Sequence, residues 1–194
     1  MRDAGLGQFL EAAEAAVTVS APEGSVAGMA AGRVFSRCRE RVGGASGTAA
    51  ARLPVCDWIA PALAGAARGP RAKVADAFGA LVDRLEWKRR LSADPADRAF
   101  WDGHANAMIF GPGGLEDRAD LWIGATVMAP RVTYVDHDHP PEEVYLSLAP
   151  GEWWNAAMDW TDPGEAGLIY NPPGIRHAMR SGDGPFLALW FLPV

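Results

Sequence analysis

The chain changes its sequence periodicity near residue 90, and this change limits the folds open to it. Before that point apolar residues recur at helical spacing, as in the stripe Val74, Phe78, Leu81, Val82 and Leu85. After about residue 99, clusters of Gly, Pro and Asp separate short β-prone segments. We therefore predict a helical region over residues 1–90 and a β-barrel over residues 91–194, which is an α+β chain that is mainly β.

The β-prone segments number eight. They cover residues 105–110, 121–128, 132–135, 143–148, 152–156, 167–170, 177–180 and 186–191. Short strands at this spacing, joined by tight turns, fit a small barrel or jelly roll. In the first half, the stripe that ends at Leu85 predicts one continuous helix, and a shorter helix is expected over residues 55–67. These helices are expected to pack on the barrel.

The composition excludes several classes of function. The net charge is −6, from 18 Lys+Arg against 24 Asp+Glu, and no basic stripe is present, which argues against nucleic-acid binding. No segment approaches the ~20 apolar residues that span a bilayer.

Acidic residues interrupt the apolar positions of residues 1–19, so this segment is predicted to be an amphipathic helix and the protein to be cytoplasmic. Cys38 and Cys56 are expected to be reduced and buried.

Three of the four histidines gather in two short motifs. His137 and His139 are two apart on an extended segment, so their side chains should share a face. Glu143 follows a Pro-Pro turn, and His177 follows Pro-Pro-Gly about thirty residues later. Three imidazoles and a carboxylate inside a barrel suit one divalent first-row metal, and Zn, Fe, Mn, Co and Ni all accept this set. His104 lies outside both motifs and is expected to be a satisfied, non-ligating histidine.

The arrangement HxHxxxE followed by PxGxxH resembles the two metal-binding motifs of the cupin superfamily. Arg131 stands where the first motif often opens with Gly, and Ser181 stands where the second often closes with Asn. The resemblance implies a cupin double-stranded β-helix preceded by α-helices. It also implies which residues bind the metal, namely His137, His139, Glu143 and His177.

A narrower resemblance covers about residues 87–194. Tyr134 and Tyr145 flank the histidine motif, and the terminal Leu187-Ala188-Leu189-Trp190 completes a pattern similar to the bacterial cupin-type dimethylsulfoniopropionate lyases. This resemblance implies a carbon–sulfur lyase that cleaves a small zwitterionic substrate, dimethylsulfoniopropionate, to dimethyl sulfide and acrylate. The oligomeric state stays open, with a homodimer among the expectations.

The implied reaction is a β-elimination, which needs a base at the carbon next to a carboxylate. A cation near a phenol favours the phenolate. Tyr145, two residues from Glu143 and on its face, is the preferred base, with Tyr134 orienting the substrate. Tyr134, three residues before His137, is the other candidate for the base. Trp190 is the candidate for binding the sulfonium cation through its ring face. Two other functions remain open: a cupin Fe(II) dioxygenase with the same ligands, and a non-catalytic metal-dependent sensor.

Other polar residues near the motifs have simpler expectations. Glu142 is expected to face solvent, Arg176 and Arg180 to form surface salt bridges, and Tyr170 to pack inside the barrel.

Overall fold

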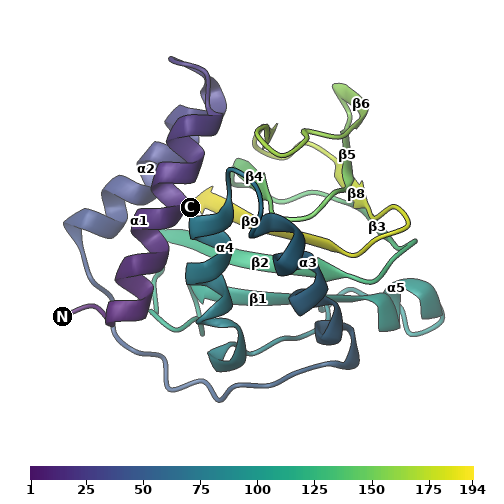
Figure 1. Cartoon of the computed structure of the whole chain (residues 1–194), viewed down its shortest axis with the longest axis horizontal. Helices are drawn as coiled ribbons and strands as arrows, with labels where there is room; N and C mark the ends of the chain where they lie inside the picture. Colours follow the sequence, from purple (N-terminus) through teal and green to yellow (C-terminus); the bar gives the residue numbers. More distant parts are fainter.

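A computed structural model describes residues 1–194 of the chain. Helices come first and strands follow, as the change of periodicity predicts (Figure 1). The helical segments are α1 (Ala4–Ser20), α2 (Val26–Glu40), η1 (Pro54–Trp58), α3 (Ile59–Ala66), α4 (Ala72–Gly79), η2 (Val82–Arg84) and α5 (Arg98–Gly103). No helix has both the length and the apolar character that crossing a membrane requires.

The strands form two antiparallel sheets. They are β1 (His104–Phe110), β2 (Leu121–Met128), β3 (Thr133–His137), β4 (Glu143–Ser147), β5 (Glu152–Asn155), β6 (Met158–Thr161), β7 (Leu168–Asn171), β8 (His177–Arg180) and β9 (Phe186–Pro193). One sheet has the order β1-β2-β9-β4-β7 and the other has the order β3-β8-β5-β6. The structure therefore has the predicted cupin barrel with helices before it.

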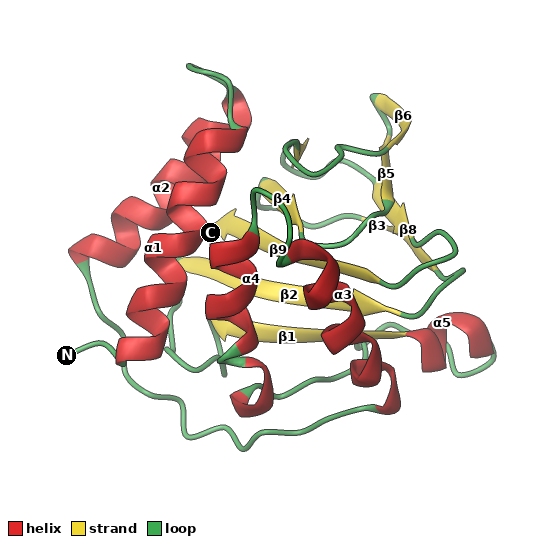
Figure 2. Ribbon diagram, viewed as in Figure 1, coloured by secondary structure: helices red, strands yellow, loops and turns green.

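Side chains on the five-stranded sheet alternate between two apolar cores. Val144 and Leu146 of β4 belong to the larger core, which lies between this sheet and the helices. Tyr145, between them in sequence, belongs to the smaller core inside the barrel. This is the period-two alternation of a strand with both faces buried. Helices α1 to α4 cover one face of the sheet, so the interior site has to lie on the other face (Figure 2).

The two long helices begin at polar capping residues. The side chain of Asp3 accepts a hydrogen bond from the amide of Leu6, and that of Ser25 accepts one from the amide of Gly28. Such caps satisfy amides that have no partner within the helix, and each contributes about 1 kcal/mol of stability.

The helices and the five-stranded sheet share one apolar core. The division of the chain into two regions at residue 90 therefore stays a prediction.

The side chain of Arg118, just before β2, links this strand to the C-terminal end of α2 by hydrogen bonds. Its fully buried guanidinium donates to the carbonyl oxygens of Arg37 and Arg41, at the C-terminal end of α2. It also pairs with Glu116 and Asp120. A helix C-terminus carries partial negative charge. A buried cation there is therefore attracted by the helix dipole and also hydrogen-bonds the carbonyl oxygens that have no partner within the helix.

Three local predictions differ from the structure. The helix expected to run through Leu85 ends at Gly79, and a turn and the short η2 follow, because the chain reverses there to bring Trp87 into the core. A ninth strand, β6, pairs with β5 although its four residues are only partly buried. Tyr170 packs against the helix-side core and not inside the barrel, since it stands opposite Val144 and shares its face.

Other expectations are confirmed. The first nineteen residues lie almost wholly in α1, whose apolar side faces the core. Cys38 and Cys56 are free thiols and are buried. Burial raises the pKa of Cys38 to about 11, so the thiol stays protonated and inert at neutral pH.

Candidate metal centre and barrel interior

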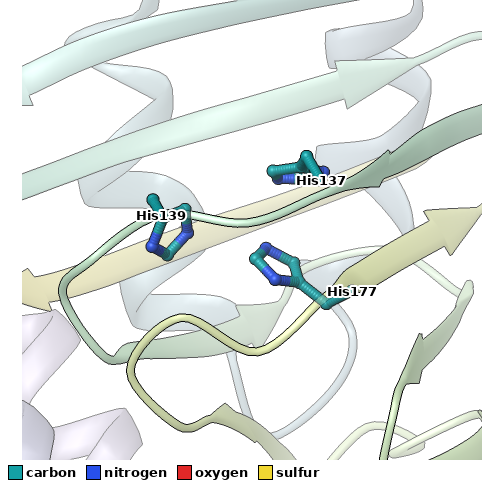
Figure 3. A group of neighbouring side chains, drawn as sticks. All are labelled: His137, His139 and His177. Atoms are coloured by element: carbon teal, nitrogen blue, oxygen red, sulfur yellow. The ribbon is translucent and has the colours of Figure 1, made fainter.

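The predicted metal ligands come from strand ends that meet at one edge of the barrel interior. His137 is the last residue of β3 and stands directly opposite His177, the first residue of β8. His139 lies two residues beyond β3, in the loop before β4. All three imidazoles point into a common space (Figure 3).

The two ligand-bearing loops are held together by a glycine. The amide of Gly174 donates a 3.0 Å hydrogen bond to the carbonyl oxygen of His139. Gly174 has φ = +68°, a left-handed conformation that glycine adopts without steric cost. This explains the glycine after Pro172 and Pro173. Arg131, which replaces a glycine common in the cupin motif, also takes a left-handed conformation, with φ = 60°.

Distances within the group fit a shared ligand. One ring nitrogen from each of His137, His139 and His177 lies within 4.8 Å of the other two. The carboxylate oxygen Oε2 of Glu143, the first residue of β4, lies 3.3 Å from Nε2 of His139 and 3.2 Å from Nε2 of His177. The structure therefore brings all four predicted ligands together.

The backbone groups around the histidines favour the tautomer that binds a metal. Nδ1 of each ring lies against a backbone carbonyl oxygen: Val135 for His137 at 3.1 Å, Pro141 for His139 at 2.9 Å and Ile175 for His177 at 2.9 Å. A proton held on Nδ1 leaves the Nε2 lone pair free to coordinate a metal. Nε2 of His177 is buried and its only polar neighbour is Oε2 of Glu143, at 3.2 Å and outside good hydrogen-bond geometry, which suits an atom that ligates a metal.

The pKa shifts of Glu143 and His137 match this donor set. Burial alone would raise the pKa of Glu143, but the imidazoles of His139 and His177, whose Nε2 atoms lie beside its Oε2, hold it well below its usual value. Burial and the nearby His177 lower the pKa of His137 to about 3, so its ring is neutral. An ionised carboxylate beside a neutral imidazole is the state that binds a divalent cation.

Two buried asparagines support Glu143 and were not identified from the sequence. Asn171 stands opposite Glu143 in the β4–β7 ladder, and its side-chain amide donates to Oε2 at 3.4 Å. Asn155 donates in turn to Oδ1 of Asn171 at 3.1 Å. Both are at most 4% exposed. Their sequence signal is weak, because an asparagine at the end of a strand more often marks a turn.

Both predicted catalytic tyrosines lie inside the barrel. Tyr145 shares the inward face of β4 with Glu143 and is 3% exposed. Tyr134 of β3 is 4% exposed, and its ring centroid lies 5.1 Å from that of His137. Burial, and for Tyr145 also the charge of Glu143, raises both phenol pKa values, to about 12 for Tyr134 and well above 10 for Tyr145. The protein alone therefore keeps both phenols protonated.

Trp190 lies beside Tyr145 on the inward side of the sheet. The two residues stand opposite each other in the β4–β9 ladder, so their side chains share a face. The indole occupies the space next to Gly124, where a Cβ atom would come within 2.2 Å of ring carbons Cη2 and Cζ2. Its Nε1 donates to the hydroxyl of Thr126 at 3.1 Å.

Arg90 supplies positive charge to the interior and was not predicted. Its guanidinium lies 5.9 Å from the centre of the Tyr134 ring and makes no hydrogen bond or ion pair with another side chain. Arg176 and Arg180, in contrast, pair with Asp136 and Glu152, as expected.

The remaining polar residues are also accounted for. His104 is satisfied as predicted, but it is completely buried: Nε2 accepts from the amide of Arg90, and Nδ1 contacts the carbonyl of Phe100. Glu142 faces away from the site and is partly buried, where it binds Arg33 and the Tyr170 hydroxyl.

Comparisons with known proteins identify a family for the chain. The dimethylsulfoniopropionate lyase family model matches residues 30–188. The curated dimethylsulfoniopropionate lyase DddQ of Ruegeria pomeroyi is 31% identical over 121 residues, which are 61% of this chain and 59% of that protein's length.

Solved structures extend the similarity of fold to nearly the whole chain. A chain from the crystal structures of the DMSP lyases RdDddP and RnDddQII superposes with a TM-score of 0.73 at 22% identity, and covers 98% of this chain and 93% of that one. The crystal structure of DddQ from Ruegeria pomeroyi gives 0.71 at 21% identity and covers 100% and 93%. Because the family model spans most of the sequence, the chain belongs to the dimethylsulfoniopropionate lyase family.

Proposed function

We propose that the protein is a metal-dependent lyase that cleaves dimethylsulfoniopropionate to dimethyl sulfide and acrylate. The observation that carries this proposal is the placement of Tyr145 between Glu143 and Trp190, on one inward face of the barrel. Membership of the lyase family supports it, as do the cluster of three histidines and the Glu143 carboxylate beside two of them. His137, His139, Glu143 and His177 would hold one divalent transition metal.

The bound metal would supply positive charge that attracts the substrate carboxylate and favours the phenolate form of a nearby tyrosine. That charge opposes the burial and the Glu143 charge that raise the pKa of Tyr145. Tyr145 then removes the proton from the carbon next to the carboxylate. The electron pair of that C–H bond forms the double bond of acrylate, and the C–S bond breaks with its pair leaving on sulfur.

Other side chains supply binding and orientation. Trp190 offers a ring face to the sulfonium cation, a contact worth about 0.5–2 kcal/mol. Tyr134 holds the substrate from the opposite sheet. Arg90, whose guanidinium lies over the Tyr134 ring and makes no ion pair, attracts the carboxylate toward this end of the barrel. A homodimer remains a prediction from the sequence.

The test is headspace dimethyl sulfide from purified protein that has been reconstituted with Zn, Fe, Mn, Co or Ni and given dimethylsulfoniopropionate without oxygen. We expect product with at least one metal, together with an equal amount of acrylate. An elimination needs no oxygen, whereas a dioxygenase does. Absence of dimethyl sulfide with every metal-replete sample would overturn the proposal, and product only in air would favour the dioxygenase.

A further inference from the structure

We propose that Asn106 and Thr126 form a one-way hydrogen-bond relay from Trp190 to Tyr134, which keeps the Tyr134 hydroxyl proton free for the substrate. This proposal deepens the proposed lyase function and rests on it for the identity of the substrate. The relay crosses the barrel interior from the five-stranded sheet, which carries Trp190, to the four-stranded sheet, which carries Tyr134. Neither Asn106 nor Thr126 is among the metal ligands or the predicted catalytic residues.

Each link of the relay has ordinary hydrogen-bond geometry. Nε1 of Trp190 donates to Oγ1 of Thr126 at 3.1 Å. Oγ1 of Thr126 donates to Oδ1 of Asn106 at 2.7 Å. Nδ2 of Asn106 donates to the Tyr134 hydroxyl oxygen at 2.8 Å. Asn106 and Thr126 stand directly opposite each other in the β1–β2 ladder, so the sheet itself fixes the middle link.

The direction of the relay follows from the chemistry of its first member. An indole N–H can only donate, so Thr126 has to accept from Trp190. The single proton of Thr126 then needs an acceptor, because this residue is 2% exposed and a buried hydroxyl proton without a partner is costly. Oδ1 of Asn106 is that acceptor. With Oδ1 turned toward Thr126, the amide protons of Asn106 face Tyr134.

The Tyr134 hydroxyl oxygen therefore accepts a hydrogen bond from Asn106, so the hydroxyl proton of Tyr134 points away from Asn106. The aromatic and cationic side chains near the Tyr134 ring include Phe100, His104, His137 and Arg90. Tyr145 lies in the same core cluster. Of the two histidines, His104 is already satisfied by backbone groups. The hydroxyl therefore remains available as a hydrogen-bond donor to a carboxylate held near His137. Asn106 and Thr126 are positioning residues that act through Tyr134.

Removal of the Thr126 hydroxyl tests the middle of the relay. Thr126→Val keeps the shape of the side chain but leaves Oδ1 of Asn106 without its donor, so the amide is free to turn and accept from Tyr134. We expect KM for dimethylsulfoniopropionate to rise about ten-fold or more, with kcat changing less, because a hydrogen bond from Tyr134 to the charged substrate carboxylate is lost. Thr126→Ser should restore KM. Thr133→Val, at an exposed threonine of β3, is the matched control and should leave KM unchanged.

A second variant reverses the last link. In Asn106→Asp the carboxylate can only accept, so Tyr134 has to donate into the relay. The rise in KM should be at least as large as in Thr126→Val. Unchanged KM in both variants, with active starting protein, would overturn the relay and leave the lyase proposal intact.

A measurement without metal or substrate tests the relay independently of activity. In protein with ¹⁵N-labelled tryptophan, the indole signal of Trp190 is identified by its loss in Trp190→Phe. Thr126→Val should shift this signal and speed its hydrogen exchange, whereas Thr126→Ser should do neither. If the unaltered protein releases no dimethyl sulfide, the lyase proposal fails. A Trp190 signal that Thr126→Val leaves in place would overturn the relay.

Discussion

The indole of Trp190 lies in the space that a side chain at Gly124 would occupy. A Cβ atom there would be 2.2 Å from two ring carbons and 2.4 Å from the carbonyl oxygen of Ala107. A shift of the backbone or of the packed Trp190 ring by that amount would be costly. The absence of a side chain at residue 124 therefore sets the position of the proposed sulfonium-binding ring.

Gly124→Ala should both destabilise the protein and impair turnover. The new methyl group displaces Trp190, so we expect a loss of about 1–3 kcal/mol in the free energy of unfolding, together with a higher KM. Urea denaturation and steady-state kinetics measure the two effects. Gly32→Ala in α2, where a Cβ atom would contact nothing within 4 Å, is the matched control and should be neutral or slightly stabilising. Wild-type stability of Gly124→Ala would show that the ring is not held there.

Phenylalanine substitutions at the two tyrosines should change different kinetic constants. Tyr145→Phe removes the proposed base, so kcat should fall by two or more orders of magnitude while the metal content stays unchanged. Tyr134→Phe removes a substrate contact, and its main effect should be on KM. Metal analysis of each purified variant is the control for an intact site. A loss of only a few-fold in both variants would show that the base is another group.

Neighbouring glutamates provide a matched test of the metal site. Glu143 faces the histidines, whereas Glu142 binds Arg33 and Tyr170 on the other side of β4. Glu143→Gln should weaken metal binding by more than the ~10–100-fold that is typical of residues that only support a ligand. Glu142→Gln should bind metal as the parent does. Titration of metal-free protein with Zn measures both, and equal affinity of the two variants would remove Glu143 from the ligand set.

Acid should destabilise the protein partly through His104. Burial lowers the pKa of His104 below its usual value, so on acidification the unfolded chain takes up a proton at this residue before the folded protein does. Stability is therefore lost as the pH falls through about 6.5, the ordinary histidine value. One such proton contributes a slope of up to about 1.4 kcal/mol per pH unit.

The check is urea unfolding between about pH 8 and 5.5, with a chelator present throughout. His104→Gln can still accept from the amide of Arg90 but does not titrate, so its stability should depend less steeply on pH. Parallel curves for the two proteins would show that His104 contributes nothing to the pH dependence. The other histidines are common to both proteins and cancel in the comparison.

Strand alternation made much of the interior predictable. The same-face placement of Glu143 and Tyr145 follows from their spacing alone, and both point into the barrel. His137 and His177 were predicted to converge, and their pairing across β3 and β8 brings this about. The placement of Trp190 depended on the family resemblance, since spacing alone did not separate it from the other tryptophans of the barrel half.

The supporting polar residues could not be predicted from local patterns. Asn106, Thr126 and Asn171 are ordinary strand residues, and their partners come from strands that are distant in sequence. Periodicity identifies a face but not the side chain that stands across a barrel. The short helix α5, which is capped by Asp97, was missed for a different reason, since six residues carry too little periodic signal.

Because both faces of β4 are buried, the strand tolerates changes of length poorly. A shift of one residue in the pairing of β4 with β7 and β9 would turn Val144 and Leu146 toward the metal site and would send a carboxylate and a phenol into the helix-side core. The polar groups would then be buried without partners. Natural variation in chain length among relatives should therefore fall in exposed turns, such as the one around Gly164, and spare this strand.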